Sequence, residues 1–373
     1  MRNLWGRLRK GRSRATRGVA AAALALGLAV CVSACGGSSN TEGEKVTAAD
    51  IEKPATGTLS VFAYEDSVTP EMMNPFKEQN PDLKIKTATF DSNAEAAAKL
   101  AAGFEVDVVE VCMDEAKPLT DRNLVRDLDT DLIPDWDSIV FHDNPNIRQN
   151  GKVIMVPLSA GPHGMMYLPS EVPEGVDSFA DLYDPKFQDK TNLESDYALP
   201  PMAVTALALG IEDPMNLTEE QIAQVRDYMI EHRDQFRSLS HSDSEVVNLF
   251  KSGEVVVSNG GRAVADRLNE EGVPVKWVVP KEGAISWVCG FGITSNAKNL
   301  PAAYRLINWQ ASPESQAIRA KNGYVVTNEK AMADVPEEFK ESADPSMLDH
   351  AIPETHPPHF EEWTKAFQQF QSG

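Results

Sequence analysis

Strand-like and helix-like patterns of hydrophobic residues alternate along the chain from about residue 58 onward. Alternating apolar positions predict strands at "TLSVFAY" and "LKIKTATF", and "VDVVEVC" is a continuous apolar run typical of a strand buried on both faces. A further strand is predicted at "ISWVCGFGIT", where Trp287 and Cys289 are two residues apart and therefore point to the same side. This alternation predicts an α/β protein with mostly parallel sheets.

Helices are predicted between these strands. The segment after Thr69 places Met72, Met73 and Phe76 on one side. Capping boxes at 92–95 and 218–221 predict two helix starts, because a Ser or Thr side chain and a Glu or Gln three residues later satisfy free backbone N–H groups. The remaining patterns predict strands at 254–261 and 273–280 and helices at 202–209, 262–272, 299–312 and 312–323.

The first residues carry the features of an export signal. Seven basic residues and no acid precede the apolar run Val19 to Val30, which is too short to span a bilayer comfortably. Val32-Ser33-Ala34-Cys35 follows, and it resembles a bacterial lipoprotein signal. We therefore expect a signal peptide over 1–34, a lipid on Cys35 and a flexible tether over 35–57; an ordinary secretory cleavage site is the alternative.

Charge and length limit the possible functions. The whole chain has 35 Lys and Arg against 56 Asp and Glu, and loss of residues 1–34 would make the balance more acidic still. Such a surface repels nucleic acid and anionic lipid. The residues after the signal exceed what one core usually supports, so two domains are expected. Two cysteines remain, Cys112 and Cys289, too few for a four-ligand zinc site.

Several stretches together resemble the solute-binding proteins of ABC importers, in the spermidine/putrescine-binding branch. The resemblance covers residues 58 to about 330, and the last forty residues match poorly. The stretches that carry it are "FDSNAEAAAKLAAG", "VDVVEV", "SFADLYDPKFQDK", "ALALG", "LFKSGEVVVSNGGRA", "PKEGAISWV", "NAKNLPAAYRLINWQASPESQA" and "GYVVTN".

The resemblance implies a two-lobed, type II periplasmic-binding fold with two mixed sheets flanked by helices and two interlobe crossings. The crossings would lie near 156–161 and 283–286. Lobe 1 would then comprise 58–157 and 286–326, and lobe 2 would comprise 158–285 and 327–373. The strand that contains Trp287 would return to lobe 1 antiparallel to the strand that ends at Cys112. That placement suggests a Cys112–Cys289 disulfide, with two buried thiols as the alternative.

The same resemblance places a ligand between the lobes. Trp287 would stack against it, and acids would pair with its ammonium groups. The candidate ligand-binding residues are Tyr64, Glu65, Asp66, Asp114, Tyr197, Asn259, Arg262, Trp287 and Tyr324.

This sequence departs from the family pattern at two positions close to these residues in the chain. Cys289 stands where the family usually has an acid, and Ser258 stands where it usually has an aromatic residue. Because an unpaired ammonium in a closed cleft is costly, these losses argue against an orthodox spermidine site. Arg262 follows Asn-Gly-Gly at a predicted helix start, where an anionic group would be favoured.

The sequence therefore predicts a monomeric, lipid-anchored substrate-binding protein of an ABC importer. It would capture a polyamine or a related amine by lobe closure and present it to the permease subunits, without a cofactor. Alternatives are a receptor for a zwitterionic or anionic solute (amino acid, opine or aminophosphonate) that uses Arg262, and a metal receptor that uses His356 and His359 of "HPPHFEE". We find no motif of a hydrolase, phosphate loop or metalloprotease, so no catalysis is expected.

Overall fold

The computed structural model describes residues 46–90 and 92–372. The predicted signal peptide, the lipidation site Cys35 and the tether up to residue 45 lie outside the described residues. In the described part, none of the helices combines the length and hydrophobicity needed to span a bilayer.

One mixed sheet organises the described chain. Its hydrogen-bonded order is β2-β1-β3-β11-β6-β9-β7-β8, with β10 added to β6 and β12 added to β11. β1 pairs in parallel with β2 and β3, and β7 pairs in parallel with β8 and β9. The strands are β1 (Gly57–Ala63), β2 (Leu83–Thr89), β3 (Val108–Cys112), β6 (Val156–Tyr167), β7 (Thr191–Glu194), β8 (Phe236–Ser240), β9 (Val257–Gly261), β10 (Lys276–Val278), β11 (Ile285–Ile293) and β12 (Ile352–Pro353), with β4 (Arg148–Gln149) and β5 (Lys152–Val153) forming a separate pair.

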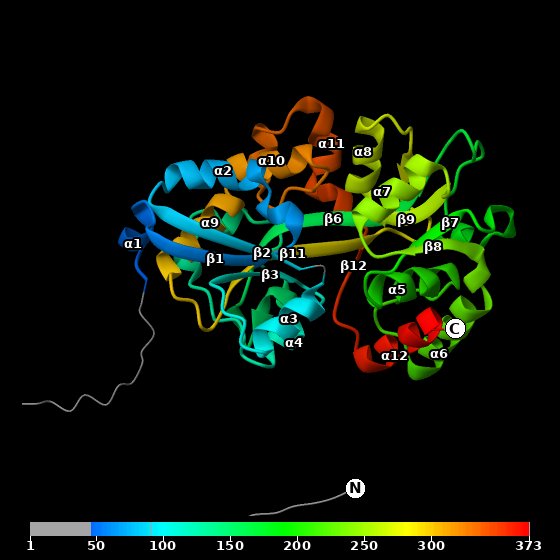
Figure 1. The fold of residues 1–373 in the computed structure, drawn as a ribbon, viewed down its shortest axis with the longest axis horizontal. Coiled ribbons are helices and arrows are strands. Elements are labelled where there is room, and N and C mark those ends of the chain that lie inside the picture. Colours follow the sequence, from blue (N-terminus) through cyan, green and yellow to red (C-terminus); the bar gives the residue numbers. More distant parts are fainter. Residues whose placement is uncertain (1–45, 91, 373) are drawn as a thin grey trace, which may run out of the picture. The chain divides into compact units, whose positions relative to one another are not determined.

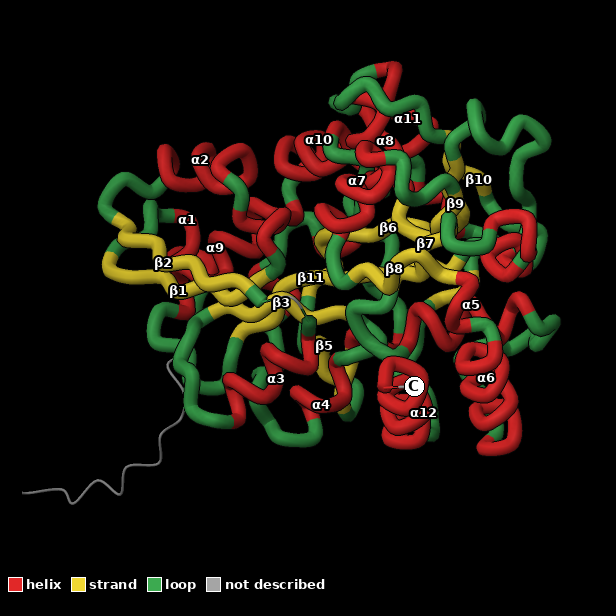
Figure 2. Tube along the Cα trace, turned by 45° about the vertical axis from the view of Figure 1, so that its right-hand side comes forward, coloured by secondary structure: helices red, strands yellow, loops and turns green. Residues whose placement is uncertain are grey.

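Helices cover both faces of this sheet (Figures 1 and 2). Helices α2, α7, α8, α10 and α11 lie on one side, and α3, α4, α5, α6 and α12 lie on the other. The helices are α1 (Ala48–Glu52), α2 (Pro70–Gln79), α3 (Asn93–Ala101), α4 (Ala116–Thr120), α5 (Leu199–Ala208), α6 (Glu219–Glu231), α7 (Asp243–Ser252), α8 (Arg262–Glu270), α9 (Leu300–Ala311), α10 (Pro313–Lys321), α11 (Lys340–Ala343) and α12 (Phe360–Ser372).

The predicted helix starts are confirmed by their caps. Ser92 Oγ accepts a hydrogen bond from the backbone N–H of Glu95 at the start of α3, and Thr218 Oγ1 accepts one from Gln221 N at the start of α6. These bonds satisfy N–H groups that the first helical turn leaves free. Local sequence is thus enough to begin both helices at the predicted residues.

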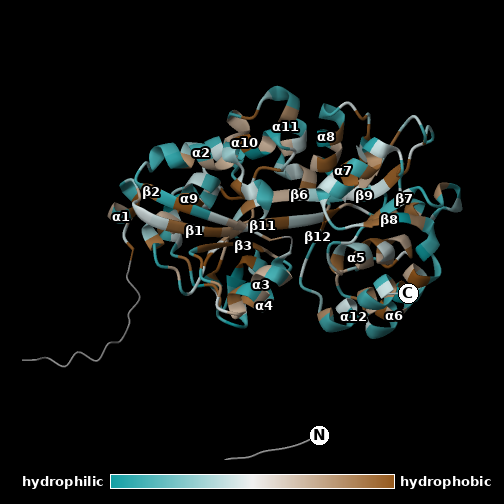
Figure 3. Cartoon of the chain, viewed as in Figure 1, coloured by the Kyte–Doolittle hydropathy of each residue, from teal (hydrophilic) through white to brown (hydrophobic). Residues whose placement is uncertain are grey.

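Two hydrophobic clusters lie along the sheet. The first core contains residues of β1, β3, α2, α3 and α9, and the second core contains residues of β9, α5, α6, α7 and α12. In Figure 3, hydrophobic positions lie along β3 and β11, whereas outer helices such as α2 and α6 carry hydrophilic positions.

The long strands β6 and β11 belong to both cores. Leu158 and Ala160 of β6 lie in the first core and Met165 in the second, while β11 contributes Ile285 to the second core and Phe291 to the first. The strands are antiparallel to each other from Ile285↔His163 to Phe291↔Val156. Their pairing joins the two expected sheets into one. β11 also pairs antiparallel with β3, with Cys289 opposite Cys112, as the sequence predicted.

Two predicted boundaries need correction. The tether was predicted to extend to residue 57, but residues 48–52 form α1, and Val46, Ile51 and Ala55 are buried in the first core. Their apolar side chains pack there instead of remaining in solvent. The segment 327–373 was predicted to lie wholly in the second lobe. Its early part instead packs beside α10.

The later part of the C-terminal segment reaches the second core. β12 pairs with the start of β11, and Trp363 and Phe370 of α12 are fully buried in that core. The chain therefore passes from one core to the other a third time after Leu348. This third passage carries Glu354 to the centre of the molecule.

Candidate functional site

Acidic side chains from three separate segments meet where β6 and β11 run between the two cores. We call Asp114, Glu115, Glu194, Asp196 and Glu354 the acidic cluster. Asp114 and Glu115 follow β3, Glu194 ends β7 and Asp196 comes two residues later. These acids meet because the carboxyl ends of β3 and β7 face the same region. Glu354 follows β12 and is held there by a hydrogen bond from its backbone N–H to Ser286 O (2.8 Å).

Four of these acids are buried and poorly neutralised. Asp114, Glu115, Glu194 and Glu354 are between 2% and 7% exposed. Asp114 Oδ2 accepts a hydrogen bond from Tyr197 OH (3.1 Å), and Glu115 Oε2 accepts one from Asn93 N (3.1 Å). Glu194 Oε2 and Glu354 Oε1 are buried without a hydrogen-bond partner.

Among the residues that the structure describes, no positively charged side chain balances this charge. Within residues 46–90 and 92–372, no lysine or arginine forms an ion pair with the acidic cluster. His163 Nδ1 lies 3.8 Å from Glu194 Oε2, but burial lowers the pKa of His163 to about 4, so its ring is neutral at neutral pH. Burying carboxylates without partners is costly, and the arrangement therefore suits a positively charged group that comes from outside the chain.

The pKa values of these acids follow first from their loss of hydration and then from the charges of their neighbours. Burial, opposed by the hydrogen bond from Tyr197, raises the pKa of Asp114 to about 6. Asp196 is exposed, yet loss of hydration beside the surrounding protein raises its pKa to about 7, and the charge of Asp243 adds to this shift. Burial, followed by the charges of Asp114 and Asp196, raises the pKa of Glu354 well above its ordinary value. A bound cation would remove much of this repulsion.

Aromatic rings lie beside the acids. The ring centroids of Trp287 and Tyr324 are 5.7 Å apart with the rings nearly perpendicular, and the His163 ring centroid lies 6.4 Å from that of the indole. The indole lies close over Gly161, where an added Cβ would approach Trp287 Cζ2 to 2.9 Å. These rings provide apolar and cation–π surface next to carboxylates.

Two further acids, Asp66 and Asp243, lie near Tyr324. Tyr324 OH donates a hydrogen bond of 2.7 Å to Asp66 Oδ2, on the 3₁₀ turn η1 (Glu65–Val68). Asp243 is the first residue of α7. It is exposed, but loss of hydration beside the surrounding protein and then the charge of Asp66 raise its pKa to about 6. Asp66 comes from the first-core side and Asp243 from the second-core side, so both sides contribute acids to the site.

The structure brings most of the sequence-predicted residues together. Tyr64, Asp66, Asp114, Tyr197, Trp287 and Tyr324 all contact or electrostatically influence one another or the acidic cluster. Asn259 is buried, and its Oδ1 accepts a hydrogen bond from Glu194 N (2.9 Å).

Glu65 and Arg262 lie differently. Glu65 is exposed on the outside of its turn. Arg262 begins α8, where its Nε lies 3.7 Å from Asp266 Oδ2 and its guanidinium lies over the ring of Trp277 (5.9 Å). Asp266 on the same helix thus already offers Arg262 an anionic partner.

Sequence reasoning missed several acids and one histidine. Glu115 and Glu194 stand at the ends of predicted strands, which is a usable signal. Glu354 is in the segment that resembles the family least, and nothing local marks it. The missed residues are Glu115, His163, Glu194, Asp243 and Glu354.

Cys112 and Cys289 form a disulfide between β3 and β11, directly beside Asp114. The His-Pro-Pro-His segment does not build a metal centre. His356 Nδ1 lies 3.0 Å from Asp114 O, and its ring packs against Phe360. In the part of the chain that the structure describes, no group of three or more His, Cys, Asp or Glu is placed to hold a metal ion. The metal-receptor alternative is therefore not carried further.

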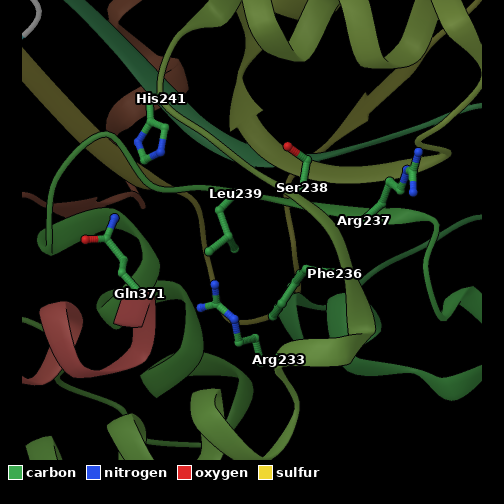
Figure 4. Close-up of a pocket in the computed structure, with 7 residues that line it drawn as sticks. All are labelled: Arg233, Phe236, Arg237, Ser238, Leu239, His241 and Gln371. Carbon is green, nitrogen blue, oxygen red and sulfur yellow. The ribbon is translucent and has the colours of Figure 1, made fainter. Parts of the chain in front are cut away.

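A separate pocket of about 440 Å³ lies beside the edge strand β8 (Figure 4). Two arginines in its wall already have partners: Arg233 donates to Phe370 O, and Arg237 pairs with Glu254 (2.6 Å). We assign it no ligand. Its wall consists of Arg233, Phe236, Arg237, Ser238, Leu239, His241 and Gln371.

Comparison with known proteins gives a consistent result. Residues 71–347 match the family described as bacterial extracellular solute-binding protein. The "Spermidine/putrescine-binding periplasmic protein 1" of Haemophilus influenzae is 26% identical over 339 residues, covering 87% of this chain and 88% of the relative. A "Putrescine/agmatine-binding protein" of Pseudomonas aeruginosa is 25% identical over 323 residues, covering 79% and 85% of the two chains.

A solved structure has the same fold. The spermidine/putrescine ABC transporter substrate-binding protein PotD from Streptococcus pneumoniae superimposes with a TM-score of 0.71 at 22% identity, covering 85% of this chain and 99% of that one. The predicted type II periplasmic-binding fold is confirmed by this likeness.

Proposed function

Because this chain belongs to the bacterial extracellular solute-binding protein family, we propose that it captures a small organic cation for an ABC importer. The ligand would be a polyamine or a related compound with at least one amino group. The prediction of a binding protein rather than an enzyme is confirmed by the family membership. The observation that carries the ligand class is the acidic cluster, whose buried carboxylates have no lysine or arginine partner in the described residues.

The site suits a cation with an apolar stem. Ammonium groups form short, charge-assisted hydrogen bonds with carboxylates, and Glu354 Oε1 and Glu194 Oε2 are free to accept them. Trp287 and Tyr324 would cover the methylenes between amino groups and add cation–π attraction. The missing acid at Cys289 argued against a polyamine from sequence alone. Glu354, whose backbone N–H donates to Ser286 O at the start of β11, adds a carboxylate to the site that the sequence had not indicated.

Binding would close two lobes around the solute. We place the lobe boundary within β6 and β11, and the C-terminal boundary after Leu348, because residues 331–343 pack beside α10. The three passages between the lobes would bend as a hinge. Scattering should then show a smaller radius of gyration when the ligand is added, and unchanged dimensions would argue against closure.

The Haemophilus influenzae relative is named as a periplasmic protein, and we propose an extracytoplasmic location for this one. Cys35 would carry the lipid that attaches it to the membrane. The protein would act as a monomer and present its closed form to the permease subunits. Mass analysis of the membrane-extracted protein, with a diacylated Cys35 as the N-terminal residue, would test the anchor.

Calorimetry with a defined panel tests the function. Putrescine, spermidine and agmatine represent the proposed class, and an amino acid, an opine and an aminophosphonate represent the alternative that uses Arg262. We expect saturable binding of at least one amine, lost when Asp114 and Glu354 are both changed to their amides. Binding restricted to compounds with a carboxylate or phosphonate, and abolished by Arg262→Ala, would replace the proposal by the alternative.

A further inference from the structure

The middle of β3 contains a carboxylate that the fold does not require. All five residues of β3 are buried, and Glu110 is 2% exposed between Val109 and Val111. An apolar residue at position 110 would be buried without a desolvation cost, whereas a carboxylate has to be compensated by partners. Burial, followed by the charge of Asp66, raises the pKa of Glu110 to about 8. The groups that bond to Glu110 therefore indicate why an acid stands at this position.

Both oxygens of Glu110 hold the turn that begins the binding site. Oε2 accepts a hydrogen bond from the backbone N–H of Tyr64 (2.9 Å), and Oε1 accepts one from Ser67 Oγ (2.8 Å). The carboxylate thus spans η1 from its N-cap to its third residue. Asp66, between these two contacts, is the acid that receives the Tyr324 hydroxyl.

A buried arginine completes the support from the other side. Arg319 of α10 is 1% exposed, and its Nη2 donates to Ser67 Oγ (3.3 Å) and to Gln310 Oε1 (3.1 Å). Gln310 Nε2 in turn donates to Ser67 O (3.2 Å). The backbone O of Arg319 accepts a hydrogen bond from Tyr324 N (3.2 Å). One buried network therefore holds both Asp66 and the tyrosine that bonds to it.

We propose that Glu110, acting through Ser67 and together with Arg319, is a positioning residue that fixes Tyr64 and Asp66 for ligand capture. The proposal rests on the proposed function, because it concerns the same binding site. Glu110 does not touch the ligand. Its two hydrogen bonds orient the turn, and preorganisation of this kind lowers the entropy that binding would otherwise lose.

Glu110→Gln tests this role. The amide keeps the volume of the side chain but has only one acceptor oxygen, so it cannot accept hydrogen bonds from both Tyr64 N and Ser67 Oγ. We expect the dissociation constant for the tightest-binding amine of the panel to rise about tenfold, since one of the two hydrogen bonds that orient the turn is disrupted. Ser67→Ala, which removes the partner of Glu110 Oε1 and leaves the acid in place, should weaken binding in the same direction.

A double-mutant cycle separates positioning from general stability. If Glu110 acts through Asp66, Glu110→Gln should weaken binding far less in an Asp66→Asn background than in the wild type. Asp107→Asn is the matched control. Asp107 is a buried acid just before β3 that accepts hydrogen bonds from Ser60, Lys298 and Asn299, at the end of the strand away from the turn. Its loss should lower the melting temperature without changing the dissociation constant.

The outcomes are distinct. Unchanged amine affinity in both Glu110→Gln and Ser67→Ala, or effects that add in full to that of Asp66→Asn, would overturn the positioning role while leaving the proposed function intact. Failure of the wild-type protein to bind any amine would instead overturn the proposed function, and this inference with it.

Discussion

The indole of Trp287 is the most direct test of the binding site at the scale of one residue. It lies over Gly161 and beside Tyr324, at the point where β11 passes between the cores. Trp287→Ala should weaken amine binding by about 1–3 kcal/mol, because apolar and cation–π contact is lost. Calorimetry measures the effect. Trp136→Ala is the control, since Trp136 packs against the first core beside His142, and an equal loss of affinity there would contradict a specific role for Trp287.

Glu354 allows a prediction with opposite effects on stability and binding. Glu354→Gln removes one of several crowded negative charges and keeps the side-chain volume. We expect the unfolding free energy of the ligand-free protein at pH 8 to rise by about 1 kcal/mol or more, since the pKa of Glu354 is raised by burial and by its acidic neighbours.

The affinity of the same variant for the amine should fall about tenfold, because one charge-assisted contact is lost. Denaturant unfolding and calorimetry give the two values. Exposed Glu338→Gln should change neither. If Glu354→Gln instead lowered the unfolding free energy of the ligand-free protein, the carboxylate of Glu354 would have to be stabilised by its surroundings, and the prediction would be wrong.

The residue scale also explains which site residues sequence could predict. Tyr64, Asp66 and Trp287 stand at strand ends or turns in the part that resembles a known family, so their roles followed from position. Glu354 and Asp243 contribute through neighbours more than a hundred residues away in the sequence, such as Asp114 and Asp66. No local pattern in the sequence shows that residues so far apart along the chain become neighbours. Arg262 was selected for its predicted helix start. Asp266 stands four residues later on the same predicted helix, so it was an i,i+4 partner readable from the sequence and was overlooked.

At the scale of secondary-structure elements, the pairing of β6 with β11 is the feature most sensitive to substitution. Gly290 lies at a register shift in this pairing, and a Cβ there would come within 1.8 Å of Val156 O. Gly290→Ala should therefore lower the unfolding free energy by about 3 kcal/mol or more, because a backbone oxygen has to move. Denaturant unfolding tests this. Gly261→Ala, whose Cβ would meet only ordinary contacts of 3.6 Å or more, should be tolerated, and equal losses would refute the steric argument.

Local signals were sufficient for the regular elements and insufficient for the C-terminal segment. Capping boxes and the spacing of apolar residues predicted α3 and α6, and β-branched runs predicted β3 and β11. Between residue 326 and the start of α12 the elements are short: α11 has four residues and β12 has two. Such elements form because long-range contacts hold them, as β12 is held by β11. Hydrophobic periodicity cannot reveal partners of this kind.

At the scale of the whole molecule, the stability of the ligand-free protein depends on pH because several of its acids have raised pKa values. Asp196 and Glu110 have pKa values raised to about 7 and about 8, and burial raises those of Glu115, Glu194 and Glu354 well above ordinary values. An acid whose pKa is higher in the folded than in the unfolded state binds its proton more tightly when folded. Its contribution to stability is therefore present at low pH and is lost as the pH rises through the folded value.

This linkage predicts how stability and binding change between pH 6.5 and 8.5. His163, whose pKa is lowered to about 4, is neutral in both folded and unfolded states through most of this window and does not oppose the effect. The unfolding free energy of the ligand-free protein should decrease as the pH rises. The stabilisation by a saturating amine should increase over the same range, because the ligand pairs with ionised carboxylates while its own amino groups stay largely protonated. Denaturant unfolding with and without putrescine measures both quantities. A ligand effect that is equal at both ends of the window would mean that the carboxylates of the acidic cluster are already ionised and paired in the free protein, which would remove the electrostatic basis for cation capture.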